Sequence, residues 1–197
     1  MFIERSQLVR RLLGAATQLF LDDADPIIVH CIASSAVEHA ELLAQDANRN
    51  PLKQHILSTF PEISEQEFKR LRNQNWNVIK HSHDRKGQPF DVPKKLADFD
   101  DWSNDAILFA GWHDYQRSGQ PLPIEAQAFQ VWFFNLYPNS VDPTKRSEVA
   151  YPSFENLTNL SRIGQKTALR EAIETARNDT DIMNHPNTDK TPLNMQK

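Results

Sequence analysis

Apolar residues recur every three or four positions along most of the chain, which is the spacing of amphipathic α-helices. Leu8, Leu12, Ala16 and Leu19 follow this spacing and predict a first helix over residues 4–21. Periodicity and capping signals predict further helices over residues 26–47, 52–60, 64–82, 103–117, 124–137 and 163–177. Glycine is scarce and strand-like alternation is hard to find. The sequence therefore predicts an all-α antiparallel helical bundle of about six to seven helices.

Three of the predicted helices begin at recognisable start signals. Asp25 is a good N-cap, and Pro26 suits the first helical position, where its missing N–H is not needed. The pair at residues 50 and 51, Asn-Pro, repeats this signal. Ser64 and Glu67 match a capping box, in which each side chain would bond the other residue's backbone N–H.

Proline and charge patterns divide the chain into three parts. Residues 1–140 are predicted to form the helical bundle domain. Residues 141–177 are predicted to form an extended excursion followed by a C-terminal helix that packs on the bundle. The polar, proline-containing stretch 178–197 is predicted to be a disordered tail.

Composition narrows the classes of function. The 22 Lys and Arg residues against 26 Asp and Glu residues give a net charge of −4, which offers no general footprint for nucleic acid or an anionic membrane. Cys31 is the single cysteine, which excludes an intramolecular disulfide framework and suits the cytoplasm. No window approaches about 18 uninterrupted apolar residues, so no membrane span or membrane partner is expected.

Candidate chemistry gathers in the stretch NWNVIKHSHD, residues 75–84. At about 100° per residue on a continuous helix, four polar side chains fall within an arc of roughly 60° beside the apolar stripe. These four are Arg70, Asn77, His81 and Asp84. Lys80 and His83 point more toward solvent.

Three interpretations of this stretch are open. His81 would carry a proton near neutral pH while Asp84 holds its ring, or the column would hydrogen-bond a ligand. His81, His83 and Asp84 would bind a divalent metal if the helix ended at Ser82. Alternatively, the polar groups form a hydrogen-bonded network that closes the bundle. No cofactor is predicted, although a divalent metal is compatible with the residues.

The segment NVIKHSHD resembles the N-x-x-K-H-x-x-D element of an uncharacterised bacterial all-helical family, in which it commonly reads like NFFKHADRD. The upstream IIVHCIASSAVEHAELL is similar to a second helix of that family, and residues 104–134 are similar to a third block. The resemblance covers roughly residues 26–138. Such proteins resemble HEPN-like helical domains, so it implies a HEPN-like bundle.

The resemblance implies functional positions on two helices. His30 matches the family's histidine, Glu38 its acid, and Ser35 and Ala36 its small pair. If the two helices pack antiparallel, His30 and Glu38 would face Asn77, His81 and Asp84 across a groove. There Glu38 would raise the pKa of His81. The alternative is that His30 and Glu38 are satisfied polar residues between helices.

HEPN-like nucleases carry an arginine that is separated from their histidine by four to six residues, and this chain departs from that pattern. The corresponding positions hold Gln74, Asn75 and Trp76. Without that arginine, a metal-independent ribonuclease loses its partner for transition-state charge. The departure favours binding over cleavage.

Two classes of function follow. The first is a cytoplasmic binding or interaction protein whose groove takes a small ligand, RNA or a protein partner through His30, Glu38, Asn77, Lys80, His81 and Asp84. The second is a nucleotide or RNA hydrolase that uses His81 and Asp84 with Glu38, with a metal as a further option. His113 and Asp114 are weaker candidates for ligands. The aromatic stretch around Trp132 and Phe133 suggests core or a homodimer interface.

Overall fold

The computed structural model describes residues 2–140 and 154–194, and its fold is all-α. The described residues form nine α-helices: α1 Arg5–Leu21, α2 Pro26–Asp46, α3 Leu52–Thr59, α4 Glu65–Lys80, α5 Val92–Lys95, α6 Ser103–Arg117, α7 Ile124–Leu136, α9 Arg162–Arg177 and α10 Thr180–Asn184. Two 3₁₀ turns, Pro138–Ser140 and Leu157–Asn159, and two short strands, β1 Leu122–Pro123 and β2 Thr188–Asp189, complete the described elements. All seven predicted helices are present, with ends within two residues of the prediction. The all-α prediction is confirmed.

The chain divides into two compact units, residues 1–119 and 120–197. The sequence places the end of the first domain at residue 140 instead. The structure ends it at Gly119, a residue with a positive φ of 87° that closes α6. Helix α7 thus belongs with the C-terminal elements.

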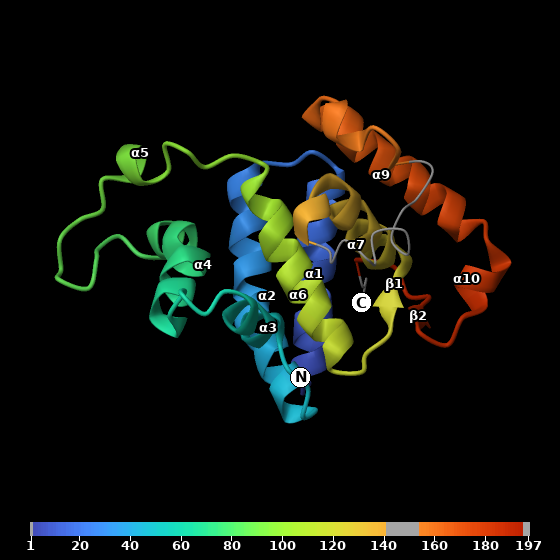
Figure 1. The fold of residues 1–197 in the computed structure, drawn as a ribbon, viewed down its shortest axis with the longest axis horizontal. Coiled ribbons are helices and arrows are strands. Elements are labelled where there is room, and N and C mark those ends of the chain that lie inside the picture. Colours follow the sequence, from blue (N-terminus) through green and yellow to red (C-terminus); the bar gives the residue numbers. More distant parts are fainter. Residues whose placement is uncertain (1, 141–153, 195–197) are drawn as a thin grey trace. The chain divides into compact units, whose positions relative to one another are not determined.

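Helices α1, α2 and α6 lie side by side and form the core of the first unit, with α1 antiparallel to the other two (Figure 1). Gly111 of α6 faces α1, where an added Cβ would lie 2.5 Å from a terminal methyl of Leu13. The glycine therefore permits the close approach of α6 to α1. Beside it the buried Trp112 ring donates from Nε1 to Thr17 Oγ1 at 2.9 Å, so its polar atom is satisfied.

The predicted helix starts are correct in part. The Asp25 side chain accepts from the Ile27 backbone N–H at 2.8 Å, and Ser64 Oγ accepts from the Glu67 N–H at 3.1 Å. Glu67 does not complete a capping box, because both of its carboxylate oxygens accept from Arg70.

Helix α3 also starts differently from the prediction, since Pro51 and not Asn50 is the N-cap and no N-cap side chain bonds the backbone. The buried Asp114 of α6 takes that role, accepting from the Leu52 N–H at 2.7 Å. Asp114 also lies 3.0 Å from His113 Nδ1. Of the two weaker ligand candidates, Asp114 thus joins α6 to α3, and His113 contacts Asp114.

An ion network fastens α3 and α4 to α2. Glu41 of α2 receives Lys53 Nζ of α3 at 2.6 Å and Arg72 Nη1 of α4 at 2.7 Å. All three side chains are only about a tenth exposed. Burial alone would raise the pKa of Glu41, but hydrogen bonds and positive charge from Lys53 and Arg72 hold it below its ordinary value. Glu41 is therefore a buried anion between two cations.

Helix α2 is apolar enough, by length and composition, to match a membrane-spanning helix. Half of its most apolar 18-residue stretch is buried inside the structure. Core helices of this length pass the same criterion. The sequence analysis predicted no membrane-spanning segment. It did not single out α2, because it considered only uninterrupted apolar runs.

In the second unit α7 packs on α9, and β1 pairs in parallel with β2, with Leu122 opposite Thr188. Residues 178–194, predicted to be disordered, carry α10 and β2, with Thr188 and Leu193 buried. The backbone pairing and these two buried side chains account for the difference. The predicted excursion 141–177 lies outside the described residues between 141 and 153.

The aromatic stretch of α7 is part of the core. Trp132 is fully buried and donates from Nε1 to the Gln165 carbonyl at 2.9 Å, and Phe133 is 9% exposed. These two rings therefore provide no exposed aromatic surface. The homodimer prediction therefore loses the aromatic surface on which it rested.

Candidate functional site

Helix α4 ends at Lys80, two residues earlier than predicted. His81 is its C-cap, with extended backbone angles, and its N–H bonds the Asn77 carbonyl at 3.0 Å. Asp84 therefore does not continue the helical column of Arg70, Asn77 and His81. It lies instead in the loop that follows.

That loop is a small hairpin over residues 82–90. His83 and Pro89 form an antiparallel bridge, and the Phe90 N–H donates to the Ser82 carbonyl at 3.0 Å. Asp84 Oδ1 accepts from the Lys86 N–H at 2.8 Å and the Gln88 N–H at 2.9 Å. Asp84 thereby shapes the turn of the hairpin.

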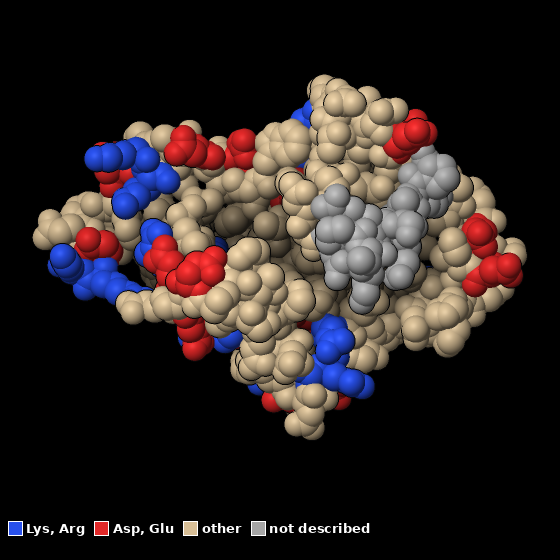
Figure 2. Space-filling model, in the orientation of Figure 1, with Lys and Arg blue, Asp and Glu red and all other residues tan. Residues whose placement is uncertain are grey.

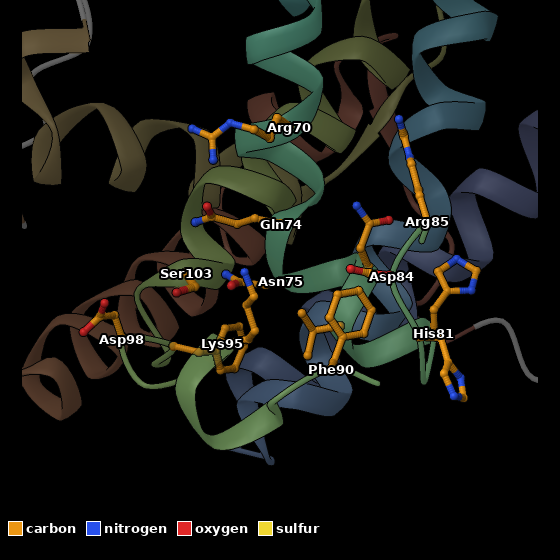
Figure 3. A pocket seen from close by; sticks show the side chains of 14 residues that line it. Arg70, Gln74, Asn75, His81, Asp84, Arg85, Phe90, Lys95, Asp98 and Ser103 are labelled. Carbon is orange, nitrogen blue, oxygen red and sulfur yellow. The ribbon is translucent and has the colours of Figure 1, made fainter. Parts of the chain in front are cut away.

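A pocket of about 650 Å³ lies between α4, this hairpin and the chain leading through α5 to α6 (Figure 3). Cationic, acidic, amide and aromatic side chains line it. The lining residues are Arg70, Gln74, Asn75, Asn77, Val78, His81, His83, Asp84, Arg85, Phe90, Lys95, Asp98, Phe99 and Ser103. All belong to the first unit.

The charges of the pocket are not all available to a ligand. Arg70 is held by Glu67, and Asp84 is engaged by backbone N–H groups. Arg85 and Lys95 form no ion pair within the part of the chain that the structure describes. Figure 3 shows the Phe90 ring between these two side chains in that view. Among the described residues, the lining side chains that carry a charge and form no ion pair are thus the cations Arg85 and Lys95 and the carboxylate Asp98.

The six predicted ligand-binding residues divide into two groups. Asn77, His81 and Asp84 line the pocket. Glu38 lies outside the pocket, 3.5 Å from Arg72 Nη2, and Lys80 Nζ lies 5.5 Å from the centre of the Trp76 ring. The predicted approach of Glu38 to His81 is therefore not found, because the Glu38 carboxylate lies beside Arg72 instead.

His30 is buried behind the pocket wall. Its Nδ1 lies 3.1 Å from Asn104 Oδ1, and its ring meets the edge of Phe99, a lining residue, at 5.2 Å. Burial lowers the pKa of His30, against the smaller opposing effect of the Asn104 hydrogen bond. His30 is thus a neutral residue behind the pocket and does not line it.

The three metal candidates line the pocket but do not converge. His83 Nδ1 lies 2.7 Å from Ser82 Oγ, and Asp84 is occupied by its turn. Within residues 2–140 and 154–194, no three His, Cys, Asp or Glu side chains are grouped so that they could hold a metal ion. The arrangement offers hydrogen bonds and positive charge to a ligand.

Sequence reasoning missed several lining residues after position 84. Arg85, Phe90 and Lys95 fall in a stretch that glycine and prolines mark as a loop, so helical periodicity carries no information there. A local signal was present: residues 80–95 contain five Lys or Arg and two Asp, a net +3 in a chain of net −4. Figure 2 shows blue side chains gathered over α5 and the loop before it.

No family model, curated protein or solved structure matches the chain. The resemblance to HEPN-like domains stays a prediction.

Proposed function

We propose that this all-α protein is a binding protein whose pocket takes an anionic ligand without turning it over. The observation that carries the proposal is a pair of cations, Arg85 and Lys95, that line a pocket of about 650 Å³ and have no ion-pair partner among residues 2–140 and 154–194. Pockets for small ligands span roughly 300–1,000 Å³. His81 and His83 line the same pocket, and their ring nitrogens add hydrogen-bonding atoms to its wall.

Binding is favoured over hydrolysis by the placement of the acidic groups. The hydrolase alternative needs Glu38 beside His81, whereas Glu38 is drawn to Arg72 and is not a lining residue. Asp84 Oδ1 already accepts two backbone hydrogen bonds, so it is poorly placed to orient His81 as well. The lining then supplies recognition without an assembled acid–base pair.

The test is calorimetric titration with inorganic pyrophosphate at low salt. Arg85→Ala and Lys95→Ala should each weaken binding by roughly tenfold, since a hydrogen bond to a charged group contributes about 1.5–3 kcal/mol and these side chains are exposed.

Lys86→Ala and Lys94→Ala are matched controls. Each control removes one positive charge at the position next to Arg85 or Lys95 in the sequence, but neither Lys86 nor Lys94 lines the pocket. Binding should stay within about twofold of the unsubstituted protein, because long-range attraction is screened by salt. No pyrophosphate binding, or equal losses in all four variants, would refute the proposal.

A further inference from the structure

Three amide side chains line the pocket next to its cations. Gln74, Asn75 and Asn77 all lie on α4, and none of their amides has a hydrogen-bond partner among the residues that the structure describes. Each amide offers a donor and an acceptor side by side. An amide of this kind can pair with two adjacent polar atoms on the edge of a planar heterocycle.

Two aromatic rings line the same pocket. Phe90 ends the hairpin, and its backbone N–H donates to the Ser82 carbonyl. The Phe99 ring packs against the buried His30 ring in an edge-to-face contact. Both rings are only partly buried, so apolar surface is open to the pocket. An inorganic anion or a sugar phosphate would leave this surface uncovered, whereas a planar base would cover it by stacking.

We infer that the ligand of this pocket is a nucleotide, with its base against Phe90 and the amides of α4 and its phosphate at one of the two cations, Arg85 or Lys95, that flank the ring in Figure 3. The inference rests on the proposed anion-binding function and names its ligand class. Cations interleaved with an aromatic ring are the usual means of binding a base together with its phosphate. A free mononucleotide and one unit of a single strand share this chemistry.

The experiment compares AMP with ribose 5-phosphate, which keeps the phosphate and sugar but lacks the base. Stacking on an aromatic side chain contributes enough to change affinity by roughly 5- to 150-fold. AMP should therefore bind at least about fivefold more tightly than ribose 5-phosphate. Phe90→Leu should remove most of this advantage and leave the affinity for ribose 5-phosphate unchanged.

Two variants make the comparison specific. Phe60→Leu changes an aromatic residue, 47% exposed, that does not line the pocket, and it should leave both affinities unchanged. Gln74→Ala alters an exposed position of α4 and should reduce AMP binding more than ribose 5-phosphate binding. It keeps the test available if thermal unfolding shows that Phe90→Leu disturbs the fold.

The outcomes separate the two proposals. Equal binding of AMP and ribose 5-phosphate, with pyrophosphate still bound through Arg85 and Lys95, would overturn the nucleotide inference and leave the anion site intact. Loss of pyrophosphate binding as well would mean that the anion site itself is absent. A base-dependent gain supports the inference. A six-nucleotide single-stranded RNA then distinguishes a free nucleotide from a strand as the ligand. Six equivalent units raise the affinity about sixfold by statistics alone, so a larger gain over AMP indicates that a strand is bound.

Discussion

Replacing Glu41 with glutamine tests how the pocket-bearing helices are held to the core. The substitution keeps the shape of the side chain but removes the charge that faces Lys53 at 2.6 Å and Arg72 at 2.7 Å. Removing one partner of a buried pair costs about 3–5 kcal/mol, because the remaining charge is left without compensation. These side chains keep about a tenth of their exposure, so water relieves part of that cost. We expect Glu41→Gln to lower the free energy of unfolding by about 2–3 kcal/mol.

The assay is urea denaturation at pH 7, followed by circular dichroism. Glu67→Gln is the control, since it breaks an ion pair with Arg70 at comparable distance on the exposed face of α4. An exposed pair contributes little, so the control should unfold like the unsubstituted protein. An unfolding curve for Glu41→Gln that matches the control would refute the idea that this network holds α3 and α4.

The same variant has a defined pH dependence. The pKa of Glu41 is below its ordinary value of 4.5 in the folded protein. A lowered carboxyl pKa contributes stability above the unfolded pKa, and this contribution is lost as the pH falls through the folded pKa. The difference between Glu41→Gln and the unsubstituted protein should therefore be full at pH 7 and shrink below about pH 4.5. A constant difference down to pH 3 would contradict the electrostatic explanation.

Two further predictions concern the core of the first unit. Gly111→Ala should destabilise the protein by about 1 kcal/mol in urea denaturation, because the buried Leu13 side chain must shift to admit the new methyl, while the higher helix propensity of alanine offsets part of that cost. Combining it with Leu13→Ala should cost less than the sum of the two single changes, and strict additivity would argue against the clash. His30 has a pKa lowered from 6.5 by burial, so the folded protein should lose stability as the pH falls below about 6.5. His30→Gln should flatten this dependence between pH 7.5 and 5.5, and an unchanged slope would locate the titrating group elsewhere.

The helices were predictable because their signals are local. Asp25, Pro26 and Ser64 act within one turn of their own helix. The apolar spacing of α1 predicted the helix but not its buried face, because Ala16 is buried while Leu8, Leu12 and Leu19 are only partly so, and Val9, Leu13 and Phe20 are buried instead. The start of α3 was not predictable in this way. Its cap comes from Asp114, 62 positions away, and helical spacing gives no information about such a partner.

The site was predictable only up to the point where α4 ends. Asn77 lies on α4 beside Val78, as helical geometry predicted, whereas His81 lines the same pocket from the extended residue that ends the helix. Asp84 was assigned to the same column, but its carboxylate forms a turn with Lys86 and Gln88 instead. The resemblance placed Glu38 opposite His81, but in the structure the Glu38 carboxylate lies 3.5 Å from Arg72.

The segment between α3 and α6 has a further consequence for motion. From Leu52 to Phe99, Val78 is the single side chain classed as buried, so the pocket is built on elements with almost no apolar core of their own. Regions of this kind open locally at a lower free energy than the whole molecule unfolds. Amide hydrogens of α4 should therefore exchange faster than those of α2. Part of the binding energy of any ligand will go into ordering α4 and the hairpin, and slower exchange there on ligand addition would measure that coupling.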